Sequence, residues 1–113
     1  MVKQTGEISK DSSGSNLTGS FSSGAYTETI DTLNFTGFEL LMSETSSNFD
    51  TIIIQVSIDD ITWINLSEIY QSDINSQYIR EFSLNNKPWR YYRLYNSSPS
   101  SISFNKILYG LLA

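Results

Sequence analysis

The chain of 113 residues contains no cysteine and no histidine. Without cysteine it has no disulfide and no thiolate nucleophile, and without both residue types a zinc site loses its usual ligands. The absence of histidine also removes the side chain that most often serves as a general base near neutral pH. We therefore expect neither an enzyme nor a bound metal or other cofactor. The lack of cysteine also fits assembly in a reducing cytoplasm.

Positive charge and long apolar runs are scarce as well. Seven Lys and Arg residues stand against twelve Asp and Glu residues, so that the formal net charge is -5. Binding to nucleic acid needs clustered cations for the phosphates, which argues against such a partner. No segment approaches the ~20 consecutive apolar residues of a membrane span. The N-terminal residues also lack the apolar core of a secretory signal, so we expect a complete small soluble protein without a membrane partner.

The residues that are abundant favour an all-β fold. Serine, asparagine, threonine, isoleucine and tyrosine dominate the sequence, and β-branched and aromatic side chains suit a pleated, half-buried surface. No stretch keeps the 3.6-residue period of an amphipathic helix. A chain of this length has room for one domain with one core.

The stretch 50–66, with the sequence DTIIIQVSIDDITWINL, predicts the hairpin around which the other strands are organised. Ile52, Ile54, Val56 and Ile58 fall on one side of its first strand, because side chains alternate with period two. Asp59 and Asp60 form the turn. Further apolar segments recur at intervals of roughly 8–12 residues, which predicts a single antiparallel β-sandwich of about seven or eight strands. Its strand order is that of a jelly roll or of an immunoglobulin-like Greek key.

Residues 1–25 are polar and rich in glycine and serine. Such a segment buries little apolar surface alone, so we predict an N-terminal arm that is either flexible or ordered only against a neighbouring subunit. Phe21 and Tyr26 are its candidate anchors. The sandwich domain is then expected over residues 26–113.

The alternation also identifies a core and a set of candidate contact residues. Trp63 follows a tight turn, where tryptophan more often fills the core than stacks on a ligand. The predicted core residues are Trp63, Ile54, Val56, Tyr92, Leu94 and Phe104. The candidate ligand or interface residues are the aromatic cluster Trp89, Tyr91 and Tyr95, together with Tyr70. They suit a sugar platform or a subunit contact, with ordinary edge packing as the alternative.

The acidic turn allows one further interpretation. Asp59 and Asp60, with Asp50 or Glu44, offer oxygen ligands of the kind that Ca²⁺ prefers. Their spacing matches no known calcium loop, so the default interpretation is that these carboxylates form turns.

Two motifs carry a resemblance to known proteins. The segment SIDDITWINL, residues 57–66, resembles a Ser-x-Asp-Gly-x-x-Trp-x-x-Leu hairpin, and RYYRL, residues 90–94, resembles a later strand that accompanies it. Both are found in discoidin-like (coagulation factor 5/8 C-terminal type) jelly rolls and in small β-sandwich proteins of phage virions. Asp60 stands where the pattern has glycine, at a turn position that favours positive φ. The chain lacks the disulfide of the discoidin type and is shorter, so the phage proteins are the nearer match.

The resemblance implies a function. It suggests a phage virion structural protein, such as a capsid decoration, head-fibre or tail accessory subunit, that is assembled in the host cytoplasm. Its partners would be other virion proteins, with several copies of the chain in the assembly. The alternative is a carbohydrate-binding discoidin-like module that attaches to a surface glycan.

Overall fold

The computed structural model describes residues 2–17, 19–33, 35–43, 51–70, 77–83, 89–104 and 106–112, and all the regular elements in these ranges are β-strands. The strands are β1 (Val2–Glu7), β2 (Ser20–Phe21), β3 (Ile30–Asp31), β4 (Gly37–Ser43), β5 (Thr51–Ser57), β6 (Ile64–Tyr70), β7 (Gln77–Ser83), β8 (Tyr91–Asn96), β9 (Ile102–Ser103) and β10 (Ile107–Leu112).

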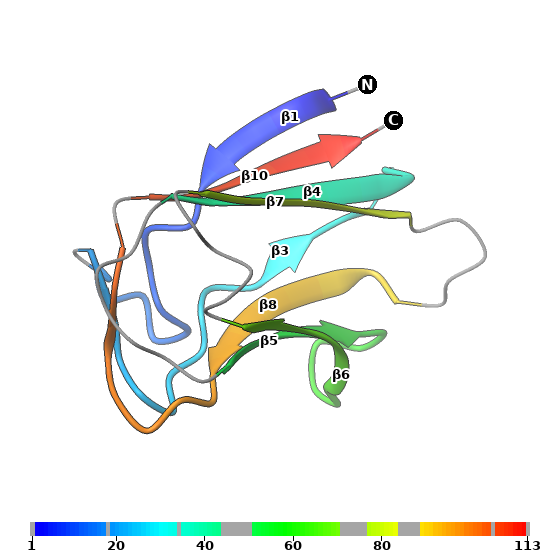
Figure 1. The fold of residues 1–113 in the computed structure, drawn as a ribbon. Helices are drawn as coiled ribbons and strands as arrows, with labels where there is room; N and C mark the ends of the chain where they lie inside the picture. The colour runs from blue at the N-terminus through cyan, green and yellow to red at the C-terminus, as the bar shows by residue number, and fades with distance from the viewer. Residues whose placement is uncertain are drawn as a thin grey trace.

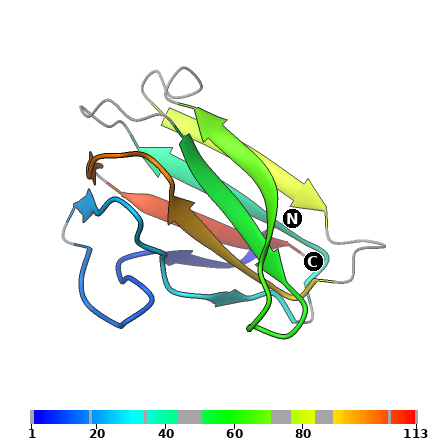
Figure 2. The same ribbon diagram turned by 90° about the horizontal axis from the view of Figure 1, so that it is seen from below.

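Eight of these strands form two four-stranded sheets that face each other (Figure 1). One sheet has the order β1-β10-β4-β7 and the other β3-β8-β5-β6, while β2 and β9 form a short ribbon. Every strand pair is antiparallel. Figure 2 looks through the β3-β8-β5-β6 sheet onto the other sheet behind it. The predicted all-β antiparallel sandwich is confirmed.

The pairing is nested along the chain. β5 pairs with β6, β4 with β7, β3 with β8, β2 with β9 and β1 with β10. The chain is thus one long antiparallel hairpin that is rolled up into two sheets, and its tip is the turn between β5 and β6. This wrapping gives the strand order of a jelly roll. The hairpin predicted over residues 50–66 therefore forms the tip of the whole roll.

The core lies between the two sheets and follows the period-two pattern. Four of the predicted core residues are fully buried: Ile54, Val56, Tyr92 and Leu94. The Tyr92 ring stacks on Phe38 of the opposite sheet, with centroids 3.9 Å apart and planes at 9°. Phe104 is partly buried and packs against the same cluster.

The N-terminal residues are part of this sandwich. β1 pairs with β10 at one edge of the first sheet, and Ile8, Leu17 and Phe21 belong to the buried core. Phe21 does act as an anchor, but it fastens the segment to its own chain. This corrects the prediction of an arm outside the sandwich and of a domain boundary at residue 26. Ile8, Leu17 and Phe21 are too widely spaced to show a period, although each of the three fills a place in the core.

Candidate functional site

The loop that joins β5 to β6 is built around the carboxylate of Asp59. Its Oδ1 accepts hydrogen bonds from the backbone N–H groups of Ile61 (2.9 Å) and Thr62 (2.8 Å) and from the Ser57 hydroxyl (3.0 Å). The N–H of Asp60 donates to the Ser57 oxygen at 2.9 Å. Asp60 has the positive φ, 63°, that was predicted for the position at which the hairpin pattern has glycine.

These hydrogen bonds also fix the charge of the loop. They lower the pKa of Asp59 to about 2, chiefly because the N–H groups of Thr62 and Ile61 stabilise the ionised form. Asp59 is therefore anionic at neutral pH. Its neighbour Asp60 accepts a hydrogen bond from the Thr29 hydroxyl at 3.3 Å, which joins the loop to the segment before β3.

The acidic residues of the loop act here as turn formers. Glu44 and Asp50, the other members of the calcium alternative, lie outside the described residues. Within the part of the chain that the structure describes, no three Asp, Glu, His or Cys side chains converge as a metal ion would require.

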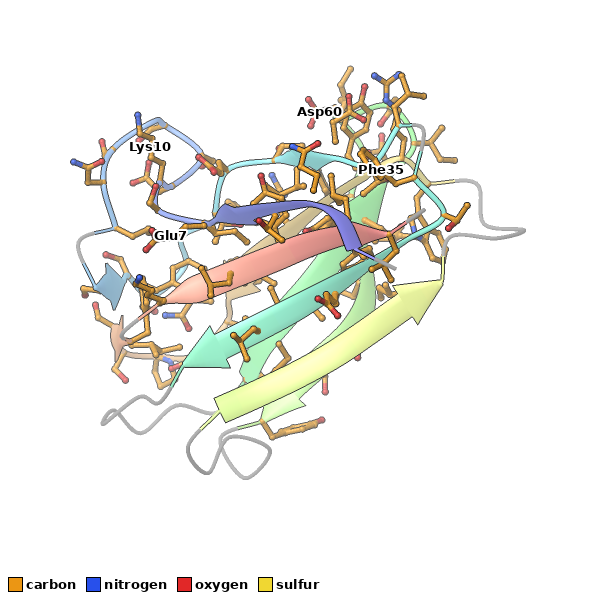
Figure 3. The ribbon with its side chains drawn as sticks, turned by 90° about the horizontal axis from the view of Figure 1, so that it is seen from above. Glu7, Lys10, Phe35 and Asp60 are labelled. Atoms are coloured by element: carbon orange, nitrogen blue, oxygen red, sulfur yellow. The ribbon has the colours of Figure 1, made fainter. Side chains whose placement is uncertain are left out.

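The same loop presents apolar side chains to solvent. Ile61 is 81% exposed, Ile58 65% and Ile64 57%. We call residues 58–64 the docking loop. Beside it lies a hollow of about 140 Å³, whose lining includes Val56 and Trp89. Figure 3 shows the side chains around Asp60 gathered at one end of the sandwich. The site is therefore an apolar apex, formed by the three isoleucines, with a rim formed by the Asp59 and Asp60 carboxylates.

A stack of cationic and aromatic groups supports the loop from the outer face of the β3-β8-β5-β6 sheet. The guanidinium carbon of Arg93 lies 3.8 Å from the ring centroid of Tyr26 and 4.1 Å from that of Trp63. Tyr26 in turn stacks on Tyr95 at 4.8 Å. Arg93 Nε also donates to Gln55 Oε1 at 2.9 Å. We call Arg93, Tyr26, Trp63 and Tyr95 the Arg93 stack.

The position of Trp63 corrects the prediction that it fills the core. It is partly exposed and lies in the docking loop, directly before Ile64, which is the first residue of β6. There the cationic face of Arg93 gives its ring a partner outside the core. Desolvation by burial lowers the pKa of Arg93, while its electrostatic interactions with Tyr26 and Asp60 oppose the shift.

The other predicted contact residues do not form one cluster. Trp89 lines the hollow beside the docking loop, and Tyr95 belongs to the Arg93 stack. Tyr91 lies under the guanidinium of Arg90, at 5.0 Å from its ring centroid. Tyr70, which is 47% exposed at the end of β6, donates its hydroxyl to Glu68. The predicted arm anchor Tyr26 joins the Arg93 stack of its own chain.

Three isoleucines and Arg93 define this site, and none of them was among the predicted contact residues. Ile58 was predicted as a strand residue and Ile61 was given no role, although isoleucines within an acidic turn are the signal for an apolar apex. For Arg93 the simplest prediction from the sequence is a cross-strand partner of an acidic residue. The contact between Arg93 and Tyr26 joins residues far apart in sequence, so no local pattern indicates it.

No helical segment among the described residues meets the length and hydropathy that a membrane span requires. Comparison of the sequence with protein-family models and with curated proteins finds no match to either.

Proposed function

We propose that this chain is a structural protein of a phage virion, a capsid decoration, head-fibre or tail accessory subunit, that binds other virion proteins through the docking loop. The observation that supports the proposal best is the exposed, preformed apex of Ile58, Ile61 and Ile64. Jelly rolls are common in viral capsid domains and in lectins, so the fold is compatible with this role. The sequence motifs shared with phage β-sandwiches favour it over other binding functions.

The apex has the chemistry of a protein contact. Exposed apolar side chains with a polar rim mark interaction sites, and burial of one isoleucine contributes roughly 1.5–3 kcal/mol. The hydrogen bonds to Asp59 hold the loop in one conformation before binding. The partner therefore meets a preorganised surface, which reduces the entropy lost on association.

The carboxylates of the rim indicate the kind of partner. Asp59 is anionic at neutral pH because of its lowered pKa. Two docking loops brought together would place these carboxylates against each other, at a cost in Coulomb energy. The proposed partner is therefore a different virion protein with an apolar pocket and cations around it. Several copies of the chain are then arranged by the symmetry of that partner.

Two experiments test this proposal. Mass spectrometry of purified particles of the encoding virus should detect the chain; its absence from them would end the proposal. Particles produced with Ile61→Ser should contain at least tenfold less of the chain than wild type, while Leu33→Ser should leave its amount unchanged. Leu33 is a matched control because it is also a solvent-exposed apolar residue, at 50%, outside the docking loop.

Carbohydrate binding is the second candidate function. The observation that favours it is the proximity of side-chain amides to the Arg93 stack. Gln55 Nε2 donates to Asn65 Oδ1 at 3.1 Å, and Gln55 also contacts Arg93. Aromatic rings beside amides combine the apolar surface and the few oriented polar groups that small-molecule sites use. Glycan-array binding that disappears in Trp63→Ala and persists in Ile61→Ser would support this function in place of the first.

A further inference from the structure

The outer face of the β1-β10-β4-β7 sheet, onto which Figure 3 looks, carries a depression of about 390 Å³ around Gly110. In the strand register Gly110 lies between Thr5 of β1 and Glu39 of β4. Leu108 and Leu41 are the next register pair on the same face. The volume lies within the range of roughly 300–1,000 Å³ that is typical of ligand pockets.

Gly110 has no conformational reason to be glycine. It lies inside β10, which has a strand on each side, and it is not among the residues of positive φ. Glycine weakens a strand and often marks a place where a ligand or another backbone approaches closely. At position 110 it keeps the outer face open between Thr5 and Glu39.

Among the residues that line the depression, the charged one is acidic. Glu39 is partly buried at its wall, and Glu7 is the register partner of Leu108. The ion pair that the structure describes, between Arg90 and Asp31, belongs to the other sheet. A second copy of this face would therefore bring carboxylate against carboxylate, which is unfavourable.

We propose that this face docks an extended segment of a partner protein and takes one of its lysine side chains into the depression at Gly110. The aliphatic stem of the lysine packs on Leu108 and Leu41, as long cationic side chains do on apolar surface. Its ammonium group donates to the Glu39 carboxylate and to the Thr5 hydroxyl. This surface lies on the sheet opposite the docking loop, so the inference is independent of the proposed function.

The test is an NMR titration of the full chain. The probe is an acetylated and amidated hexapeptide that alternates leucine with lysine. We expect the backbone amides of Thr5, Leu108 and Gly110 to shift. The substitution Glu39→Gln should weaken binding roughly tenfold or more, the size of one charge-assisted hydrogen bond. Gly110→Val, which fills the depression while keeping a strand residue, should abolish the shifts.

Matched controls separate this site from general charge attraction. Glu28→Gln removes the same charge from a part of the chain outside this sheet, so it should change the affinity less than twofold. A peptide with glutamate in place of lysine should not bind. Equal weakening by Glu28→Gln, equal binding of the glutamate peptide, or shifts confined to Ile61 and Thr62 would each overturn the inference. The last of these outcomes leaves the docking loop as the binding surface.

Discussion

Aspartate carboxylates close two loops of this chain in the same way. Asp59 Oδ1 receives the N–H groups two and three residues ahead. Asp11 Oδ1 receives those of Ser13 at 2.9 Å and Ser15 at 3.0 Å. The Asp11 pKa is also lowered, chiefly by its hydrogen bond from the Ser13 hydroxyl. Of these two loops, the one at Asp59 exposes isoleucines. The Asp59 carboxylate fixes the conformation of the docking loop, and the isoleucines provide its apolar contact surface.

The lowered pKa of Asp59 predicts a pH dependence of stability. The folded-state pKa is about 2 and the ordinary value is 3.8. The ionised carboxylate therefore stabilises the fold above pH 3.8, and this contribution is lost as the pH falls from 3.8 toward 2. The thermal unfolding midpoints of wild type and Asp59→Asn, measured from pH 5 to pH 2, should differ less at pH 2 than at pH 5. A difference that stays constant over this range would contradict the role given to Asp59.

A second residue-scale prediction concerns Tyr92. Its ring is buried and its hydroxyl has no hydrogen-bond partner among the described residues. Burial also raises the pKa of this hydroxyl, so it stays neutral. An unpaired buried polar group is costly, so Tyr92→Phe should stabilise the protein by about 1 kcal/mol. Urea unfolding measures this, with Tyr95→Phe on the outer face as the neutral control. A loss of stability in Tyr92→Phe would show that the hydroxyl has a partner.

At the scale of elements, the sequence predicts strands better than it predicts their partners. The alternation of Ile52, Ile54 and Val56 identifies β5 because it is local. Ile102 and Phe104 share one parity and Ile107 and Tyr109 the other, which predicts a β-bulge near Asn105 and Lys106. Asn105 lies outside the described residues, but β9 lies in the ribbon with β2, and β10 lies in the first sheet. A change of sheet and a β-bulge both switch which alternate residues face the core, so the sequence pattern does not distinguish them.

The candidate site was predictable only in part, for the same reason. The acidic turn and the positive φ at Asp60 follow from residues close in sequence. The residues that surround Trp63 depend on how β5 and β6 pair, and the local sequence does not show this register. Between β5 and β6 the pairing shifts at Ile54 and Gln55, and such a shift changes which side chains share a face. The contact of Trp63 with Arg93 also needs β8, which arrives from elsewhere in the chain.

The Arg93 stack predicts a specific stability difference between two arginines. Arg93 joins the docking loop to the segment before β3 through two rings, so Arg93→Ala should cost about 1–2 kcal/mol. Arg90→Ala is the matched control. Its side chain is 41% exposed. It forms a bidentate surface ion pair with Asp31, at 2.8 and 2.7 Å, and contacts one ring at a longer distance, 5.0 Å, so a smaller loss is expected. Urea unfolding of both variants compares them. Equal losses would contradict a special role for the stack.

At the scale of the whole molecule, the jelly roll makes the two ends of the chain neighbours. Val2 pairs with Leu112, and Gly37 pairs with the same residue on the other side. β1 thus covers the edge of β10, and an uncovered edge strand of this kind promotes aggregation. The contacts are mostly long-range, which predicts slow folding, in milliseconds to seconds.

Removal of residues 1–7 distinguishes the observed fold from a detachable arm. The truncated chain loses β1, so β10 becomes an edge with Ile107 and Leu111 on its core side. We expect a lower unfolding midpoint and aggregation, measured by urea unfolding and by light scattering after size exclusion. A truncated protein that stays monomeric with an unchanged midpoint would support the arm and contradict the role of β1.

The docking loop is the central functional claim, and site-specific photo-crosslinking in assembled particles tests it most directly. A photoreactive amino acid is placed at position 61, and at position 33 in a control of similar exposure. The account predicts a covalent adduct between position 61 and a different virion protein, and none from position 33. Particles that contain the chain but give no adduct from position 61, or give the same adduct from both positions, would contradict it.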